Sequence, residues 1–409
     1  MPAKPVHIVG IGADGWSGLG SDARQALIDA EVVLGSERQL ALLPDVVAAH
    51  RHPWPKPLLP ELASVLRSHA GRRVAIVASG DPMHFGIGAR LVGLLGAARV
   101  RVLPHPSSMS IACARLGWAV QDVEVVSIVG RPLALMHPAV QPGRRVLVLV
   151  GDGDGAAAVC RLLCERGYGD SDVTVLERLG ARDERVRSGT ARSLLGISHD
   201  ALTIAALDCR ADTGVAPLPR TPGLPDDAYC HDGQITKREI RALALAALAP
   251  VPGQLLWDVG AGSGSVGIEW MRTHPSCRAI AIEPRQDRRL GAERNAESLG
   301  VPGLRLVAGA APGALAELPP PDAVFVGGGA SVPGVLEACL NALSPGGRLV
   351  ANAVTLQAES ALVGWQARLG GTLTRLEVQR ARPLGGFTGW QPARPITQWS
   401  YIKQDGEPV

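Results

Sequence analysis

Short apolar runs alternate along the C-terminal half of this chain with segments whose apolar residues recur at helical spacing. Residues 255–259 and 279–282 have the length and character of buried parallel strands, and residues 265–273 between them are predicted to form a helix. Further helices and strands are expected around them, at residues 237–248, 288–299, 304–308, 322–326, 332–343, 348–353 and 357–369. Two final runs, 373–380 and 396–403, are predicted to be antiparallel strands that close the sheet. This order is typical of a doubly wound α/β sheet.

The N-terminal half alternates in the same way and ends in a stretch rich in proline. Strands are expected at residues 6–9, 31–34, 73–78, 100–103, 123–128, 145–150, 172–177 and 203–207. Residues 217–227, PLPRTPGLPDD, have no periodicity, which favours an interdomain linker. A chain of 409 residues is long enough for two or three domains. We therefore predict one domain over 1–207, a linker over 208–228 and a second domain over 229–409.

A glycine-rich loop follows the first strand of the second domain. The strand ends at Asp258, and Gly260, Gly262 and Gly264 stand at alternate positions after it. Glycine lets a loop adopt positive φ and approach a ligand closely, and the first N–H groups of the next helix face polar ligand atoms. Glu283, about 20 residues past the loop, is spaced to accept hydrogen bonds from ribose hydroxyls. A G-x-G-x-x-G pattern from Gly262 fits a dinucleotide, but the register from Asp258 resembles class I S-adenosylmethionine (SAM) methyltransferases.

Other strands of the first domain also end at turns that suit a ligand. A second G-x-G-x-x-G pattern starts at Gly10, but the next strand ends at Gly35, not at an acid. Because the ribose partner of a dinucleotide site is missing, we interpret these glycines as a tight turn that can line a pocket. The turns SGDP at 79–82 and PHPSS at 104–108 follow other strands. Ligands bind outside the carboxyl ends of strands in open α/β sheets, so both turns are candidate contacts.

The composition narrows the possible functions. Net charge is only +3 and basic residues do not cluster with aromatic ones, so no nucleic-acid partner is expected. The N-terminus lacks the form of a signal peptide and no run of 18 apolar residues occurs, so we expect a cytoplasmic protein with no membrane partner. The seven cysteines include no C-x-x-C pair, and Asp152 and Asp154 do not continue into an EF-hand loop. We therefore expect reduced thiols and no metal site.

The N-terminal half resembles the tetrapyrrole methylases, and among them the branch that acts on carbon 5 of a precorrin ring. The segments that carry the resemblance are VGIG at 9–12, SGDP at 79–82, PSS at 106–108, ERLG at 177–180 and DER at 183–185. The resemblance implies a two-lobed domain whose cofactor contacts are Gly80, Asp81, Ser107 and Ser108, with the turn at 10–12 nearby. The Gly-Pro-Gly of these proteins is Gly-Ala-Asp at 12–14 here, a departure that weakens the case for this turn as a substrate-binding element.

The C-terminal half resembles the class I methyltransferases that methylate carbon 15 of a precorrin and remove a carboxyl group. The segments are ITKRE at 235–239, DVGAGSG at 258–264, IEP at 282–284, GAAP at 309–312 and DAVFVGG at 322–328. The resemblance implies a Rossmann-like domain with cofactor contacts at Thr236, Asp258, Gly260, Ala261, Gly262, Ser263, Gly264, Glu283 and Ala311. Ala310 occupies the position at which many such enzymes have an aspartate on the adenine, so that contact must come from elsewhere.

Together the two halves resemble a fused methyltransferase of cobalamin biosynthesis, with a precorrin substrate and one SAM site in each domain. Such an enzyme would act mainly by aligning an activated methyl group with a nucleophilic ring carbon. A cation or proton donor can assist loss of CO2, and Lys237, Arg238 and Arg382 are candidates, although solvated surface cations explain each of them as well. The resemblance also implies a homo-oligomer. An NAD- or FAD-dependent oxidoreductase and a SAM-dependent RNA methyltransferase are the alternatives.

Overall fold

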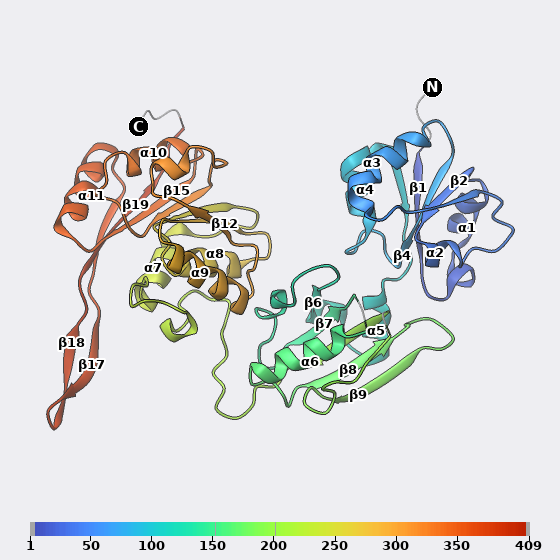
Figure 1. Cartoon of the computed structure of the whole chain (residues 1–409), viewed down its shortest axis with the longest axis horizontal. Helices are drawn as coiled ribbons and strands as arrows, with labels where there is room; N and C mark the ends of the chain where they lie inside the picture. The colour runs from blue at the N-terminus through green and yellow to red at the C-terminus, as the bar shows by residue number, and fades with distance from the viewer. Residues whose placement is uncertain (1–4, 152, 201, 406–409) are drawn as a thin grey trace. The chain divides into compact units, whose positions relative to one another are not determined.

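The chain folds into two compact units (Figure 1), and its computed structural model describes residues 5–151, 153–200 and 202–405. Unit 1 contains the described residues up to Leu133 together with Ala139–Ala216. Unit 2 contains Ala134–Pro138 and the described residues from Pro217 onward. The division after Ala216 lies inside the segment that we predicted to be a linker. Asp152, which entered the prediction about metal sites, lies outside the described residues.

The first lobe of unit 1 is a five-stranded sheet in the order β3-β2-β4-β1-β5. All four neighbouring pairs are parallel. The inner strand β4 is buried on both faces, as a parallel sheet covered by helices requires. The elements are β1 (Val6–Ile11), α1 (Ser21–Ile28), β2 (Val32–Gly35), α2 (Glu37–Leu40), β3 (His50–Pro53), α3 (Leu58–Ser68), β4 (Val74–Ser79), α4 (Ile87–Leu95) and β5 (Val100–Leu103).

The second lobe of unit 1 is a mixed five-stranded sheet in the order β6-β7-β10-β8-β9. Only β6 and β7 pair in parallel, and the other three pairs are antiparallel. Helix α5 covers this sheet, since Met109 and Cys113 pack against Leu147 and Leu176. The elements are α5 (Ser108–Leu116), β6 (Val123–Ser127), β7 (Arg145–Leu149), α6 (Gly155–Glu165), β8 (Asp172–Glu177), β9 (Arg185–Thr190) and β10 (Thr203–Asp208).

Unit 2 is built on a seven-stranded sheet in the order β13-β12-β11-β14-β15-β19-β16. The first five strands are parallel, while β19 runs antiparallel to β15 and β16 runs antiparallel to β19. The strands are β11 (Leu255–Val259), β12 (Arg278–Glu283), β13 (Arg305–Ala308), β14 (Ala323–Val326), β15 (Arg348–Ala353), β16 (Thr372–Leu376) and β19 (Ile396–Ile402). The helices are α7 (Arg238–Leu248), α8 (Ser265–Thr273), α9 (Gln286–Ser298), α10 (Val335–Ala342) and α11 (Leu356–Leu369).

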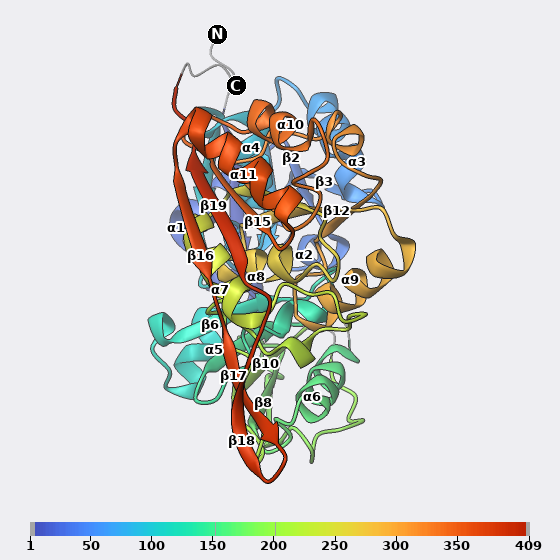
Figure 2. The same ribbon diagram turned by 90° about the vertical axis from the view of Figure 1, so that its left-hand side faces the viewer.

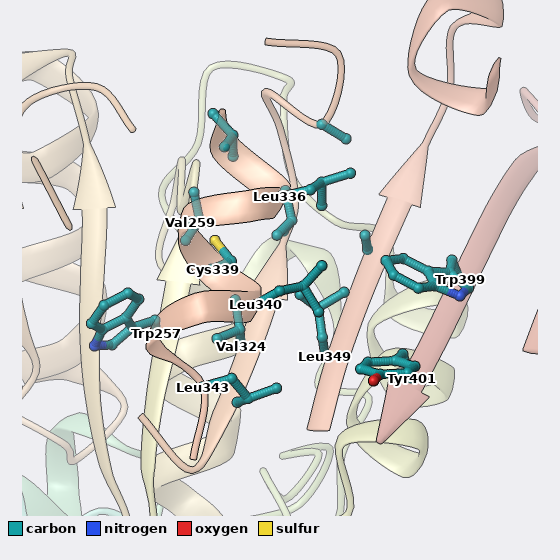
Figure 3. Close-up of a cluster of buried hydrophobic side chains, with 14 of the residues drawn as sticks. Trp257, Val259, Val324, Leu336, Cys339, Leu340, Leu343, Leu349, Trp399 and Tyr401 are labelled. Atoms are coloured by element: carbon teal, nitrogen blue, oxygen red, sulfur yellow. The ribbon is translucent and has the colours of Figure 1, made fainter. Parts of the chain in front are cut away.

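The helices of unit 2 cover both faces of its sheet. On one face, strand residues such as Trp257 and Trp399 pack with Leu336 and Leu340 of α10 (Figure 3). On the other face, α7, α8 and α9 pack over the alternate strand positions, such as Leu256 of β11. This two-sided burial explains why the parallel strands are continuous apolar runs in the sequence. It also leaves the carboxyl ends of β11 to β14 free to carry loops.

A long β-hairpin projects from the sheet of unit 2 (Figures 1 and 2). It consists of β17 (Gln379–Leu384) and β18 (Phe387–Pro392), which pair only with each other in the described sheets. We predicted one strand over 373–380, but β16 ends at Leu376 and the hairpin follows. The hairpin was missed because its apolar side chains are exposed, so no buried face imposes a regular pattern.

The proline-rich segment after Ala216 packs onto unit 2. Leu224 is fully buried, and the backbone N–H groups of Gly223 and Leu224 donate to the carboxylate of Glu269 at 2.6 and 3.0 Å. Arg241, also buried, donates to Glu269 at 2.6 Å and to the Leu224 carbonyl. A buried ion pair whose members are also hydrogen-bonded to the backbone gives this proline-rich segment a defined path.

The predicted fold class is confirmed: the chain is α/β, with a two-lobed first part and a doubly wound second part. Besides the hairpin, α2, β3 and β9 were not predicted: α2 and β3 have only four residues each, and β9 is largely exposed and polar. Among the described residues, every helix is too short or too polar to cross a bilayer.

Candidate active sites

A cavity of about 810 Å³ opens at the carboxyl ends of the parallel strands of unit 2. Four consecutive turns of the sheet edge contribute to it, at residues 259–262 after β11, 282–285 after β12, 309–311 after β13 and 327–329 after β14. Residues 233–237, before α7, close one side. This is the position at which open α/β sheets bind their ligands.

The glycine loop after β11 has a backbone that only glycine adopts without strain. Gly260, Gly262 and Gly264 have φ angles of 72°, 56° and 73°. A Cβ atom on Gly260 would lie 3.0 Å from the backbone nitrogen of Gly328, so the loop runs directly against the turn after β14. Beside Gly262, by contrast, a Cβ would meet only the Gln234 carbonyl, at 3.8 Å. The loop therefore presents bare backbone to the cavity.

Glu283 links this loop to β12. Its Oε2 accepts a hydrogen bond from the N–H of Gly262 at 2.9 Å, and its Oε1 accepts one from the N–H of Arg285 at 3.0 Å. The carboxylate lines the cavity although it is almost fully buried. Each carboxylate oxygen has a second lone pair, so Glu283 can accept two further hydrogen bonds without releasing the loop. Its geometry fits the hydroxyl pair of a ribose.

Three of the predicted cofactor contacts lie behind the cavity wall. Asp258 is 1% exposed and faces α8, where it accepts the N–H of Gly267 at 2.9 Å. Burial, and then the charge of Glu283, raises the pKa of the Asp258 carboxyl to about 7. Ser263 is buried, its carbonyl accepts from Asn295 at 2.9 Å, and Gly264 packs under the loop. The three residues therefore support the loop from behind the cavity wall, and their contact with a cofactor stays a prediction.

Of the other predicted residues of the second domain, some line the cavity and some do not. Thr236, Gly260, Ala261, Gly262, Glu283 and Ala311 line the cavity, and Ala310, which was not a predicted contact, lines it with them. Among the candidate cations Lys237 lines it, paired with Asp226 at 3.6 Å, whereas Arg238 and Arg382 lie outside the lining. Arg382 is on the exposed hairpin strand β17.

One side of this cavity was not expected from the sequence. Its apolar part comes from Val332, Val354, Leu376, Val378 and Ile396. Its polar part includes Asn352, Arg394 and the pair of Arg380 with Glu239, whose Nη2 and Oε2 atoms are 2.5 Å apart. Val332 precedes α10 and Glu239 belongs to α7, whereas the other residues come from the ends of β15 and β16 and from the hairpin base, which no local motif connects to the glycine loop.

Unit 1 has its own cavity, of about 540 Å³, lined by both of its lobes. All four predicted contacts, Gly80, Asp81, Ser107 and Ser108, line it, and Gly12 lines it with them. The second lobe contributes residues 149–151, 178–179 and 202–204.

Close backbone packing explains the first glycine motif. A Cβ atom on Gly10 would lie 2.1 Å from the carbonyl oxygen of Gly80, so β1 and the turn after β4 can meet only if residue 10 is glycine. Gly80 itself has a φ of 54°. Asp81 Oδ1 accepts the N–H of Met83 at 2.8 Å, and Ser107 caps α5 by accepting the N–H of Ser110 at 3.1 Å. Our interpretation of the Gly10 motif as a tight turn beside a pocket agrees with this geometry.

Residues of α2 also face this cavity, and we did not predict them. Ser36, Arg38 and Gln39 line it together with Ser79. The sequence does contain a pattern that predicts the start of this helix: Ser36 and Gln39 have the S-x-x-Q spacing of a capping box, and in the structure both of its hydrogen bonds form. Arg178, from the second lobe, lines the same cavity. Its φ angle is 53°, and its guanidinium forms an ion pair with Asp183 at 2.8 Å.

Comparisons with known proteins agree with this two-part architecture. The family described as "Precorrin methyltransferase domain" matches residues 227–403, and the family described as "Tetrapyrrole (Corrin/Porphyrin) Methylases" matches residues 5–195. A precorrin-6Y C(5,15)-methyltransferase [decarboxylating] of Sinorhizobium sp is 49% identical, with 97% of this chain and 96% of the relative covered. The same enzyme of Mycobacterium tuberculosis (strain CDC 1551 / Oshkosh) is 48% identical, with coverages of 98% and 100%.

Among solved structures, the C-terminal domain of precorrin-6Y C5,15-methyltransferase from Rhodobacter capsulatus is 50% identical. It covers 45% of this chain and 99% of its own length, with a TM-score of 0.43. The sequence relatives cover nearly the full length of both chains at identities close to one half. The chain therefore belongs to the family of decarboxylating precorrin-6Y C(5,15)-methyltransferases.

Proposed function

We propose that this chain transfers methyl groups from SAM to carbons 5 and 15 of a precorrin and removes CO2 from an acetate side chain. Unit 1 would methylate carbon 5, and unit 2 would methylate carbon 15 and decarboxylate. The observation that supports this most strongly is the presence of two separate cavities, each at the carboxyl ends of a parallel sheet and each lined by glycine turns. Family membership removes the oxidoreductase and RNA methyltransferase alternatives.

In unit 2 the cavity fits SAM. Gly260 and Gly262 leave backbone free of side chains, and Glu283 retains acceptor capacity for a ribose. SAM, when bound, supplies a methyl group on a sulfonium, which needs no further activation. The task left to the protein is to hold the ring carbon in line with that methyl group and to exclude water. The apolar wall of Val332, Val354 and Leu376 suits the flat face of a macrocycle.

Decarboxylation, unlike methyl transfer, needs a proton donor. The electron pair of the broken C–C bond passes into the conjugated imines of the ring, and the acetate carbon that remains takes up a proton. Lys237 is the predicted cation that lines the cavity, and its pairing with Asp226 at 3.6 Å holds an ammonium donor there. Arg285, Arg288, Arg380 and Arg394 line the same space. The first three pair with Asp232 or Glu239, so Arg394 is the arginine best placed to bind a carboxylate of a precorrin.

In unit 1 the four predicted contacts converge on one cavity. Gly80 brings bare backbone to it, and Ser107 and Ser108 begin α5 at its edge. The Gly80 turn and the two serine hydroxyls give this cavity polar contacts beside apolar side chains such as Trp54 and Phe85, a combination that suits a nucleoside-containing ligand. We therefore assign one SAM site to each unit.

We also propose that the chain works as a homo-oligomer joined through the β17–β18 hairpin. Leu384, Phe387 and Trp390 are 70%, 83% and 73% exposed on it. Only 3% of the chain is aromatic, so two exposed aromatic side chains on one hairpin are notable. Apolar patches of this kind usually mark an interface, and unpaired strand edges favour association with another copy.

The thiols support the expected compartment. All seven cysteines are free. Burial raises the pKa of Cys160 to about 11 and that of Cys209 to about 12, so both remain protonated thiols near neutral pH. Free thiols of this kind fit a reducing compartment such as the cytoplasm.

Blocking one cavity at a time tests the proposed division of labour. Gly262→Arg fills the unit 2 cavity, and Gly80→Arg fills that of unit 1. The products formed from the precorrin are identified by mass spectrometry and NMR. Gly262→Arg should retain methylation at carbon 5 and lose carbon-15 methylation and decarboxylation, and Gly80→Arg should do the reverse.

Gly364→Arg on α11 and Gly93→Arg on α4 are matched controls, because a Cβ at either glycine meets no atom within 4 Å and neither residue lines a cavity. Ala311→Trp and Ser108→Trp repeat the block without a positive-φ position, and circular dichroism checks folding. Loss of both methylations from one blocked cavity, in a folded protein, would contradict the proposal.

A further inference from the structure

Helix α2 places a basic side chain at the unit 1 cavity through a rigid local structure. Ser36 Oγ accepts the N–H of Gln39 at 3.3 Å, and Gln39 Oε1 accepts the N–H of Ser36 at 2.9 Å. This reciprocal capping box begins the helix where β2 ends. Arg38 lies between the two capping residues, and all three line the cavity.

Two donors from α2 converge on a single hydroxyl at the end of β4. Arg38 Nη2 donates to Ser79 Oγ at 2.8 Å, and Gln39 Nε2 donates to the same oxygen at 2.9 Å. Gln39 is buried, and its other amide atom is held by Ser36, so its orientation is determined. With two hydrogen bonds arriving at its oxygen, the Ser79 hydroxyl has its own hydrogen left to donate.

The charge of Arg38 has no counterpart among the described residues. Arg178 in the same cavity pairs with Asp183, but no described carboxylate forms an ion pair with Arg38. Asp81, the nearest acid along the β4 turn, accepts the N–H of Met83 instead. Arg38 is an exposed residue, although partial burial lowers the pKa of its guanidinium. An anion that enters the cavity can therefore reach the guanidinium and form charge-assisted hydrogen bonds with it.

We propose that Arg38 and Ser79 form a carboxylate-binding corner in the unit 1 cavity. The guanidinium has five N–H donors in a planar fork, and its hydrogen bond to Ser79 uses one of them. The remaining N–H groups of Arg38 and the O–H of Ser79 can donate hydrogen bonds to the same carboxylate. The inference rests on the proposed function, which supplies two sources of this chemistry: a carboxylate side chain of the precorrin and the methionine carboxylate of SAM.

The test uses the full chain carrying Gly262→Arg, so that only unit 1 binds cofactor. Arg38→Gln, Arg38→Lys and Ser79→Ala are compared with Arg90→Gln, an exposed arginine of α4 that lines neither cavity. Calorimetry gives the Kd of S-adenosylhomocysteine and of 5′-methylthioadenosine, which lacks the carboxylate. Initial rates of carbon-5 methylation give the KM for the precorrin.

Arg38→Gln should raise either the Kd of S-adenosylhomocysteine or the KM for the precorrin about tenfold or more, since a hydrogen bond to a charged group contributes roughly 1.5–3 kcal/mol. Arg38→Lys should recover part of the loss, because it keeps the charge without the fork, and Ser79→Ala should weaken the same constant to a smaller extent. A higher Kd for S-adenosylhomocysteine with an unchanged Kd for 5′-methylthioadenosine assigns the corner to SAM. A higher precorrin KM with both Kd values unchanged assigns it to the substrate.

If the parent methylates carbon 5 and Arg38→Gln changes every constant no more than Arg90→Gln does, the corner is refuted while the proposed function stands. If the parent neither binds S-adenosylhomocysteine nor methylates carbon 5, both fail. A fall in kcat alone, with all three constants unchanged, would indicate a structural role for Arg38 and would also refute the corner.

Discussion

Replacing Asp258 by asparagine should change how the stability of unit 2 depends on pH. The carboxyl is fully buried beneath the glycine loop, and its pKa is about 7 in the folded chain against 3.8 in the unfolded one. Between these values the folded state holds a proton that the unfolded state has lost, so this group's contribution to stability falls as pH rises from about 4 to about 7. Above pH 7 the folded carboxylate is ionised and buried, and its penalty is constant.

The size of the effect follows from the two pKa values. One pKa unit corresponds to about 1.36 kcal/mol, so between pH 5 and pH 8 the wild-type chain should lose about 2–3 kcal/mol through this group. Asparagine does not titrate, and its carbonyl oxygen can still accept the N–H of Gly267, 2.9 Å from the present carboxylate oxygen. Its buried NH2 group adds a cost of roughly 1–3 kcal/mol that does not vary with pH.

Denaturant unfolding at pH 5, 6, 7 and 8 measures the difference between the wild type and Asp258→Asn. Because the chain has two units, hydrogen exchange of peptides from β11 and α8 identifies the transition that belongs to unit 2. The free energy of unfolding of the variant should rise relative to the wild type by about 2–3 kcal/mol across this range. Parallel curves for the two proteins would refute the reasoning.

Three further perturbations test other parts of the structure. Trp257→Ala, in the core of Figure 3, should lower the stability of unit 2 by about 3–5 kcal/mol, measured by denaturant unfolding. Glu283→Gln should weaken SAM binding in unit 2 by roughly tenfold or more while carbon-5 methylation persists, measured by calorimetry and product analysis, because the amide replaces a charged acceptor. Serine at both Phe387 and Trp390 should leave the circular dichroism spectrum of the folded chain unchanged but shift light-scattering mass to smaller species, and an unchanged mass would contradict the proposed interface.

Features that depend on residues close together in the chain, such as buried strands and the motifs at their ends, could be predicted from the sequence. The alternation of apolar runs defines the parallel sheets, because strands buried on both faces must be apolar throughout. The glycines at 260 and 262 and the acid at 283 were found because each lies at a strand end, and the structure brings them to one cavity.

Arrangements that depend on distant segments could not be predicted in this way. Asp258 belongs to the motif, but which face of β11 it occupies follows from the packing of α8, and that packing buries it. Arg38 approaches Ser79 only because β2 and β4 are neighbours in the sheet, although 41 residues separate them in the chain. Likewise, no local pattern connects the hairpin base at Arg394 with the glycine loop.

The proposed function depends on two independent SAM sites in one chain. Titration of the full chain with S-adenosylhomocysteine in a calorimeter tests it most directly, since the number of sites is obtained with the heat of binding. We predict two sites per chain for the wild type, one for Gly262→Arg and one for Gly80→Arg. A wild-type chain that binds a single equivalent, abolished by one of these substitutions and unaffected by the other, would contradict the account.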